Sequence, residues 1–130
     1  RFESRGLGDV YKRQLLAYSP LAGGLLTGKY LNENMPHDSR MTRVSTIGDR
    51  VNKNAMKAVQ EYLKISKKYN IHPVHLALAF CTKRPFMGSV IFGATTDEQL
   101  DVVIKGLDVD LNDEIMKEIS LVYKNYALTF

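Results

Sequence analysis

The chain has 130 residues, of which 45% are hydrophobic and 25% charged, so it is long enough to bury a core and is not predicted to be disordered. Its 18 basic and 14 acidic residues give a net charge of +4, but the excess is scattered among acids, which disfavours a nucleic-acid-binding protein. A single cysteine, Cys81, excludes an internal disulfide, and the sequence contains neither a signal-like pattern nor the roughly 20 apolar residues of a membrane span. We therefore expect a cytoplasmic location.

Residues 1–14 differ in character from the sequence that follows. They read RFESRGLGDVYKRQ and show neither helical nor strand periodicity before the sequence changes abruptly to LLAYSPLAGG. The stretch GLGDVYKRQ resembles a translated sequencing-adapter remnant. We interpret residues 1–14 as a non-native leader, so that Gly6 and Gly8 do not form a phosphate loop. A native surface arm is the alternative.

The first predicted element is a short strand from Leu15 to Ser19, which Pro20 ends. The following segment as far as Tyr30, SPLAGGLLTGKY, contains three glycines and one proline, and residues 31–49 continue as a polar stretch without clear periodicity. A connection of this length inside a compact domain is usually functional.

Two helices are predicted next. Asn52 is placed to cap the first helix, which we expect to run to about Tyr69. Its apolar face should contain Met56, Val59, Leu63 and either Tyr62 or Ser66. Pro73 suits the first turn of the second helix, whose sequence VHLALAFCTKR is apolar on most sides. His72 and His75 lack the i, i+4 spacing of a helical zinc pair, so we interpret them as cap or packing residues.

The second half of the chain repeats this order of strand and helix. Residues 89–94, SVIFGA, are β-rich and lead directly into a helix that should end near Gly106. Asn112 is placed to cap a last helix. The apolar face of that helix should contain Ile115, Ile119, Val122 and Tyr126.

Two strands separated by helices imply parallel pairing through a right-handed crossover, so the predicted fold class is α/β. A complete (β/α)8 TIM barrel needs about 250 residues. We therefore expect this chain to supply only the C-terminal part of such a barrel, about the last two βα units and a terminal helix.

The junction between the second strand and its helix is a candidate anion site. Gly93 would let a ligand approach the backbone, and Thr95 or Thr96 opens the helix. Thr96 with Gln99, and Thr95 with Glu98, both have the spacing of a capping box. Parallel barrels often bind phosphate with the loops after strands seven and eight and a nearby helix N-terminus. The alternative is a well-capped helix that binds nothing.

Any phosphate at this junction needs cations from elsewhere in the chain. Asp97 and Glu98 lie in the first turn of the helix and lower the positive potential there. Lys29 and Arg40, in the first long connection, are the candidate cations, and a guanidinium suits a phosphate monoester. Each of them taken alone is more commonly a solvated surface charge.

Two separate motifs resemble the loops after the seventh and eighth strands of aldo-keto reductases. The first is LLAYSPLAGGLLTGKY at residues 15–30, followed by the pattern P-x-x-S-R at residues 36–40. The second is SVIFGATTDEQL at residues 89–100, which overlaps the block RPFMGSVIFGATT at residues 84–96. The resemblance is strongest to the Tas-like and potassium-channel β-subunit branch. It implies that residues 15–130 are the C-terminal fragment of a reductase barrel and carry its nucleotide-binding loops.

The resemblance also implies a set of residues that bind NADP(H), and both phosphate cations are present, which favours NADP over NAD. From the nicotinamide end through the pyrophosphate and ribose phosphate to the adenosine, these residues are Tyr18, Ser19, Pro20, Leu21, Gly24, Lys29, Arg40, Gly93, Thr95 and Gln99. Many family members have a Glu-Asn pair that contacts the adenine where this chain has Val102 and Val103. The resemblance therefore does not imply which residues of this chain contact the adenine.

The activity that the resemblance implies for the parent protein is hydride transfer between NADPH and a small aldehyde or ketone. In the family this chemistry uses a tyrosine supported by lysine, aspartate and histidine, all from earlier strands. No tyrosine here stands in that motif, so we nominate no catalytic residue and expect this chain alone to be inactive. Two alternatives remain, a non-enzymatic nucleotide-binding regulatory subunit of channel-β type and an independent nucleotide-binding module.

Overall fold

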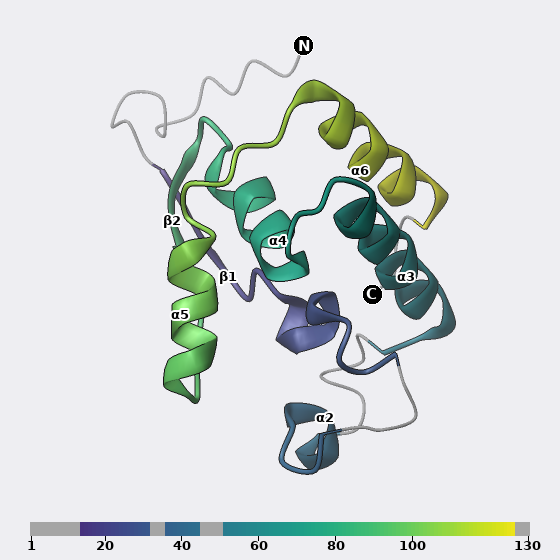
Figure 1. The fold of residues 1–130 in the computed structure, drawn as a ribbon, viewed down its shortest axis with the longest axis vertical. Coiled ribbons are helices and arrows are strands. Elements are labelled where there is room, and N and C mark those ends of the chain that lie inside the picture. The colour runs from purple at the N-terminus through teal and green to yellow at the C-terminus, as the bar shows by residue number, and fades with distance from the viewer. Residues whose placement is uncertain (1–13, 32–35, 45–50, 127–130) are drawn as a thin grey trace.

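The computed structural model describes residues 14–31, 36–44 and 51–126, and Figure 1 shows their arrangement. Two strands, β1 (Leu15–Tyr18) and β2 (Met87–Ile91), form one parallel pair. The helical elements are the 3-10 segment η1 (Ala22–Thr27), α2 (Arg40–Arg43), α3 (Lys53–Lys68), α4 (Pro73–Thr82), α5 (Asp97–Lys105) and α6 (Asp113–Asn125). The predicted α/β class and the parallel pairing are confirmed. All but the last residue of the proposed leader, residues 1–14, lie outside the described residues, and that interpretation stays a prediction.

The strand pairing corrects the predicted bounds of the second strand. It begins at Met87 and ends at Ile91, whereas the sequence predicted residues 89–94. Tyr18 is aligned with Ile91, and β1 ends at Tyr18, so β2 has no partner beyond that point. At the other end the amide of Leu15 donates to the carbonyl of Phe86, at 2.9 Å, which extends the contact upstream. The available partner, rather than β-propensity, therefore sets the length of β2.

The helix starts follow their capping residues as predicted. The side-chain oxygen of Asn52 accepts from the Ala55 amide, and that of Asn112 accepts from the Ile115 amide, both at 2.9 Å. His72 caps α4 by accepting from the Val74 amide through Nδ1 at 3.3 Å, which confirms its predicted role. These side chains satisfy backbone donors that the first helical turn leaves unpaired. Within the described ranges, no helix is long and apolar enough to cross a membrane.

Helix α3 packs on two sides, and this makes its buried face wider than predicted. On one side Val59 is buried with Leu25 and Tyr30, and Met56 and Leu63 pack partly buried against that cluster. On the other side α3 packs against α6. The buried members of this second cluster are Ala58, Ile65, Leu76, Ile115, Ile119 and Val122. The apolar face predicted for α6 is confirmed. Ala58 and Ile65 were not predicted to be buried, because the sequence was searched for one apolar face on α3, whereas this helix packs against two neighbours.

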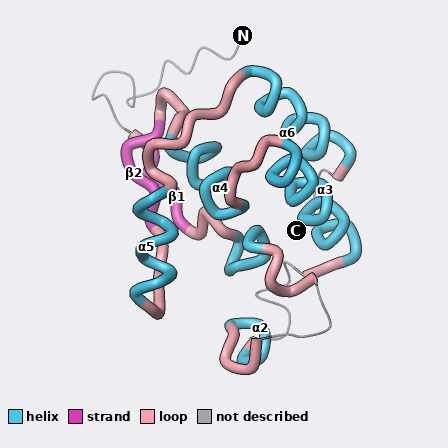
Figure 2. Tube along the Cα trace, viewed as in Figure 1, coloured by secondary structure: helices cyan, strands magenta, loops and turns pink. Residues whose placement is uncertain are grey.

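Helix α4 occupies the centre of the fold. The strands and α5 lie on one side of it and α3 and α6 on the other, as Figure 2 shows. Val74 and Leu78 of α4 form a buried cluster with Val103 of α5, and Leu21 and Val90 pack against it. The buried residues on several sides of α4 explain its near-continuous apolar sequence. The polar stretch 31–49 was predicted without a helix but contains the single turn α2, whose four residues are too few for a periodicity signal.

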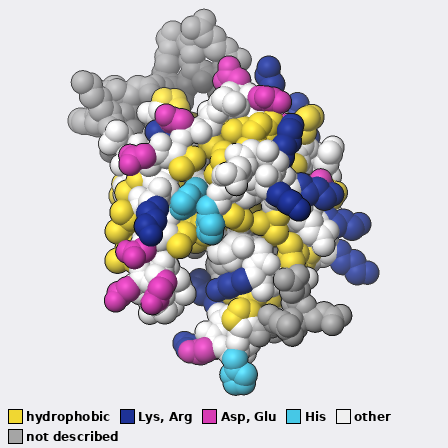
Figure 3. Space-filling view, viewed as in Figure 1, with side chains coloured by type: hydrophobic (Ala, Val, Ile, Leu, Met, Phe, Trp, Pro, Cys, Tyr) yellow, Lys and Arg dark blue, Asp and Glu magenta, His cyan; other side chains and the backbone are white. Residues whose placement is uncertain are grey.

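The two-stranded sheet is exposed along one margin. The exposed fractions of Leu16, Tyr18 and Ile91 are 63%, 73% and 53%. Hydrophobic side chains reach the surface along this margin in Figure 3. Parallel sheets are almost always covered on both faces, so these strands lack part of the cover that their class requires.

This exposure predicts the behaviour of the 130-residue chain when it is produced alone. The uncovered apolar strands should cause self-association and binding of a hydrophobic dye such as ANS. Light scattering during size-exclusion chromatography measures the first, and dye fluorescence the second. A monomer with one sharp unfolding transition would contradict the interpretation that the sheet is incomplete.

Candidate phosphate-binding site

The parallel pairing brings the two predicted half-sites to the same end of the molecule. Because Tyr18 is aligned with Ile91, the connections that follow β1 and β2 leave the sheet at the same edge. Figure 1 shows η1, α2 and the beginning of α5 together at that end of the fold. The crevice at the carboxyl ends of parallel strands is where α/β proteins bind their ligands.

The hydrophobic cluster around α4 fixes the two half-sites to one support. Leu21, from the connection after β1, packs against the cluster that contains Val103 of α5. The side chain of Leu21 therefore faces the core, and this residue can offer a ligand only its backbone. Tyr18, by contrast, ends β1 with its side chain mostly exposed.

The connection after β1 adopts a backbone that is unusual for its residues. Five positions have positive φ: Ser19 (57°), Ala22 (49°), Gly23 (69°), Gly24 (98°) and Gly28 (80°). Two of these are not glycine, and a non-glycine residue held in this region costs roughly 1–3 kcal/mol. Such strain is concentrated at ligand-binding segments more often than elsewhere, which supports the functional interpretation of this loop.

Gly24 lies directly under two polar side chains. A Cβ atom at this position would be 3.2 Å from Cε of Lys29 and 3.4 Å from the hydroxyl oxygen of Tyr30. The ammonium of Lys29 lies 5.0 Å from the centre of the Tyr30 ring, within cation–π range. A Cβ at this position would crowd both side chains, so only glycine lets Lys29 and Tyr30 pack over this turn.

Tyr30 carries a buried hydroxyl that the sequence did not single out. Only 5% of the residue is exposed, and the hydroxyl forms no hydrogen bond with any group in the part of the chain that the structure describes. Ser39, beside Arg40, has a similarly unpartnered buried hydroxyl among the described residues. The glycines and Lys29 pointed to this loop, but no sequence pattern indicates that an adjacent tyrosine is buried without a partner.

Among the described residues, neither candidate cation forms an ion pair with a carboxylate. On α2, Arg43 donates to Asp38, with 2.6 Å between Nη2 and Oδ1, and this contact raises the pKa of Arg43. The ion pairs formed within residues 14–31, 36–44 and 51–126 include neither Arg40 nor Lys29, and both residues are exposed. The sequence could not distinguish the two arginines of α2, whereas the structure leaves only Arg40 of this pair available for an anion.

The beginning of α5 forms a capping arrangement around Thr96. The Thr96 hydroxyl accepts from the Gln99 amide at 3.3 Å. The Gln99 side-chain oxygen accepts from the amide and the hydroxyl of Thr95, at 3.1 and 3.2 Å. The pair Thr96 and Gln99 therefore provides the cap, and the Nε2 hydrogens of Gln99 are the part of its amide that can face a ligand. A hydrogen bond from the Thr96 side chain lowers the pKa of Glu98, which keeps that carboxylate negative.

Gly93 precedes this helix in open space. No atom lies within 4 Å of the position that a Cβ would occupy there. The polar residues around the start of α5 are exposed, so a ligand can reach them. Val103, in contrast, is 4% exposed and belongs to the core, and Val102 packs against the same cluster. Val102 and Val103, which replace the Glu-Asn pair, therefore contribute to core packing. They offer no polar side chain to an adenine.

The residues of this end of the fold suit a phosphate-bearing ligand. In the described part of the chain, the Tyr30 hydroxyl has no hydrogen-bond partner, and Lys29 and Arg40 form no ion pair with a carboxylate. Among the described residues, no three His, Cys, Asp or Glu side chains come together as a metal site requires. His75 is used in packing, because it lies against Gly106 and its Nε2 is 2.7 Å from the Val102 carbonyl oxygen.

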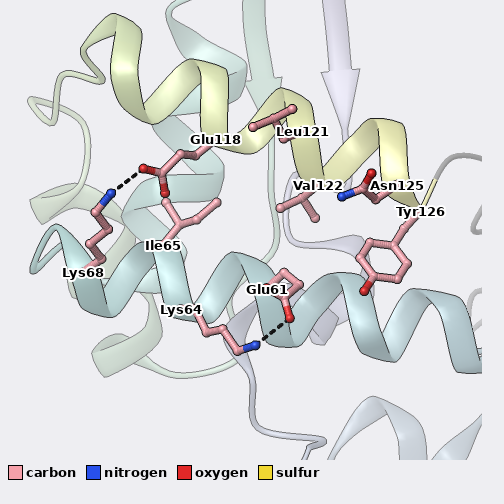
Figure 4. A pocket seen from close by; sticks show the side chains of 9 residues that line it. All are labelled: Glu61, Lys64, Ile65, Lys68, Glu118, Leu121, Val122, Asn125 and Tyr126. Carbon is pink, nitrogen blue, oxygen red and sulfur yellow. Dashed lines mark hydrogen bonds and ion pairs between the residues drawn. The ribbon is translucent and has the colours of Figure 1, made fainter.

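A separate cleft of about 600 Å³ lies between α3 and α6, and Figure 4 shows its lining. Its charged groups are paired with one another, Lys68 with Glu118 and Lys64 with Glu61. The contact with Lys68 lowers the pKa of Glu118. This cleft contains none of the predicted site residues, and its cations are already neutralised.

Comparison with known proteins identifies the class to which this fold and site belong. Residues 1–124 match the sequence profile of the Aldo/keto reductase family. The chain is 39% identical over 125 residues to protein tas of Escherichia coli, covering 94% of this chain and 36% of that protein. It is 35% identical over 130 residues to a probable voltage-gated potassium channel subunit beta of rice, Oryza sativa, covering 92% and 38%. The chain therefore belongs to the aldo/keto reductase family, and it spans little more than a third of the length of these relatives.

A solved structure supports the fold. The glycerol dehydrogenase of Gluconobacter oxydans superposes with a TM-score of 0.68 and 21% sequence identity, covering 92% of this chain and 37% of that enzyme. At this identity the likeness concerns the fold alone. The α/β arrangement of the chain is accordingly that of part of a reductase barrel.

The backbone geometry predicts a loss of stability for one glycine substitution and almost no change for another. Gly28→Ala places a side chain at a φ of 80° and 2.8 Å from Cδ1 of Leu63, and should lower the free energy of unfolding by about 1–2 kcal/mol. Gly93→Ala is the matched control and should stay within about 0.5 kcal/mol of the parent, because its new Cβ meets open space. Urea unfolding measures both. Equal stability of the two variants would show that the backbone of the first loop is not held as described.

Proposed function

We propose that residues 15–130 form the last two βα units and terminal helix of a (β/α)8 barrel and supply the NADP(H)-binding part of an aldo/keto reductase-like oxidoreductase. The observation that carries it is that the connections after β1 and β2 leave the parallel sheet at the same edge. The first of these connections and α2 carry two exposed cations, Lys29 and Arg40, that form no ion pair among the described residues. Family membership supplies the cofactor class.

Each part of the site has a distinct task in binding. The strained loop from Ser19 to Gly24 lines the pyrophosphate with its backbone. Lys29 and Arg40 hold the ribose phosphate, and the planar guanidinium matches two phosphate oxygens at once. Thr95 and Gln99, fixed by their mutual hydrogen bonds, complete the adenosine side together with Gly93.

The chemistry of the parent protein belongs to residues outside this chain. NADPH supplies the hydride that reduces the carbonyl carbon of a small aldehyde or ketone. Tyr18, exposed at the end of β1, lies beside the nicotinamide and orients it. No residue of this chain acts as the acid that protonates the carbonyl oxygen, so the segment binds and orients the cofactor in the cytoplasm but does not turn over substrate alone.

A regulatory subunit is the second candidate function, and the match to the rice channel subunit favours it. Such a protein would keep the nucleotide site and act through a partner instead of through catalysis. The two candidates differ in turnover. A barrel completed with upstream strands that carry a tyrosine, lysine, aspartate and histidine should reduce aldehydes if the first is correct, whereas tight NADPH binding without turnover would favour the second.

The phosphate role of Arg40 predicts a loss of cofactor selectivity. The test protein is a completed barrel, defined as a chimera in which residues 15–130 replace the matching part of E. coli protein tas. Arg40→Ala should weaken NADPH binding by about tenfold or more and NADH binding less than about twofold, since only NADPH carries the 2′-phosphate. Fluorescence titration with each cofactor measures the two dissociation constants.

Arg43→Ala is the matched control for this experiment. Arg43 lies on the same single turn but is neutralised by Asp38, so its removal should leave both dissociation constants unchanged. Equal losses for NADPH and NADH in Arg40→Ala would refute the 2′-phosphate role. Failure of the parent chimera to bind either cofactor would refute the proposed function as a whole.

A further inference from the structure

The buried hydroxyl of Tyr30 lowers the stability of the protein when no ligand is bound. It is buried and unpartnered among the described residues, and a buried donor without an acceptor costs roughly 1–3 kcal/mol. If the ring served only to fill space, phenylalanine would fill it equally well without this cost. The hydroxyl therefore calls for a partner that the described residues do not provide.

The ring is held rigidly, so the position of its hydroxyl is fixed. Tyr30 is buried in a cluster with Leu25 of η1 and Val59 of α3, and Met41 of α2 packs against the same cluster. The residue thus joins the loop after β1 to the helix that carries Arg40. A donor fixed by core packing needs no reorganisation when a ligand arrives.

The hydroxyl lies over Gly24, in the loop that the proposed function assigns to the pyrophosphate. Its oxygen is 3.4 Å from the point that a Cβ of Gly24 would occupy, and Cε of Lys29 is 3.2 Å from that same point. The flexible stem of Lys29 and the Tyr30 hydroxyl therefore both lie over Gly24. A phosphate that draws the ammonium toward itself moves this stem, which lies beside the donor.

We infer that the Tyr30 hydroxyl donates a hydrogen bond to a phosphate oxygen of the bound dinucleotide and forms, with Lys29, one phosphate subsite. The inference rests on the proposed function and assigns to the site a residue outside the set predicted from the sequence. A hydroxyl that donates to an anionic oxygen makes a short, strong hydrogen bond. The phosphate oxygen belongs to the pyrophosphate or to the 2′-phosphate, and NADPH and NADH distinguish them.

Tyr30→Phe in the completed barrel tests this inference by binding and by stability. The dissociation constant for NADPH should rise about tenfold. A similar rise for NADH assigns the bond to the pyrophosphate, and no change for NADH assigns it to the 2′-phosphate. Without cofactor, the melting temperature should stay the same or rise, because the substitution removes an unpartnered buried hydroxyl and keeps the ring.

Tyr69→Phe is the matched control. The Tyr69 hydroxyl donates to Glu118 at 2.7 Å, between α3 and α6, so its loss should lower the melting temperature by a few degrees and leave cofactor binding unchanged. The inference is overturned if Tyr30→Phe binds both cofactors as tightly as the parent, or if it loses as much cofactor-free stability as Tyr69→Phe. If the parent chimera binds neither cofactor, the proposed function fails first and the inference fails with it.

Discussion

The alignment of Tyr18 with Ile91 in the parallel pair determines where the rest of the candidate site lies. It directs two connections, far apart in the sequence, to one edge of the sheet. Packing then holds them there, because Leu21 from the first connection and Val103 from α5 share the cluster centred on α4. Without this shared support the glycine-rich loop and the start of α5 would be two unrelated turns. The polar groups of the two connections can act on one ligand only because the connections leave the sheet at the same edge.

Some cations of this chain are paired with acids and others are not. On α3, Lys53, Lys57 and Lys67 form no ion pair among the described residues, whereas Lys64 and Lys68 are paired with acids. On α2 the same is true of Arg43 but not of Arg40. A cation that has no carboxylate partner within the described residues, next to a strained loop and an unpartnered buried hydroxyl, is a combination that favours an anionic ligand. Each feature alone has an ordinary structural explanation.

Local signals predicted much of the fold, and three-dimensional contacts decided the rest. The caps at Asn52 and Asn112 and the proline start of α4 identified their helices because capping acts within one turn. The end of β2 was misplaced because the strand stops where its partner stops, which no local pattern encodes. In the site, glycines and cations were visible as residue types, and the structure brings their loops to one end. The buried state of Tyr30 depends on α2 and α3 packing around it, so the sequence could not reveal it.

The central claim is that the connection after β1 and the start of α5 form one dinucleotide site. Amide hydrogen exchange of the completed barrel, measured with and without NADPH, tests it most directly because it reports on both segments in one experiment. The account predicts that the cofactor slows exchange together in residues 19–30 and 93–99, at one common midpoint of cofactor concentration. Protection of only one segment, or protection confined to the cleft between α3 and α6, would contradict it.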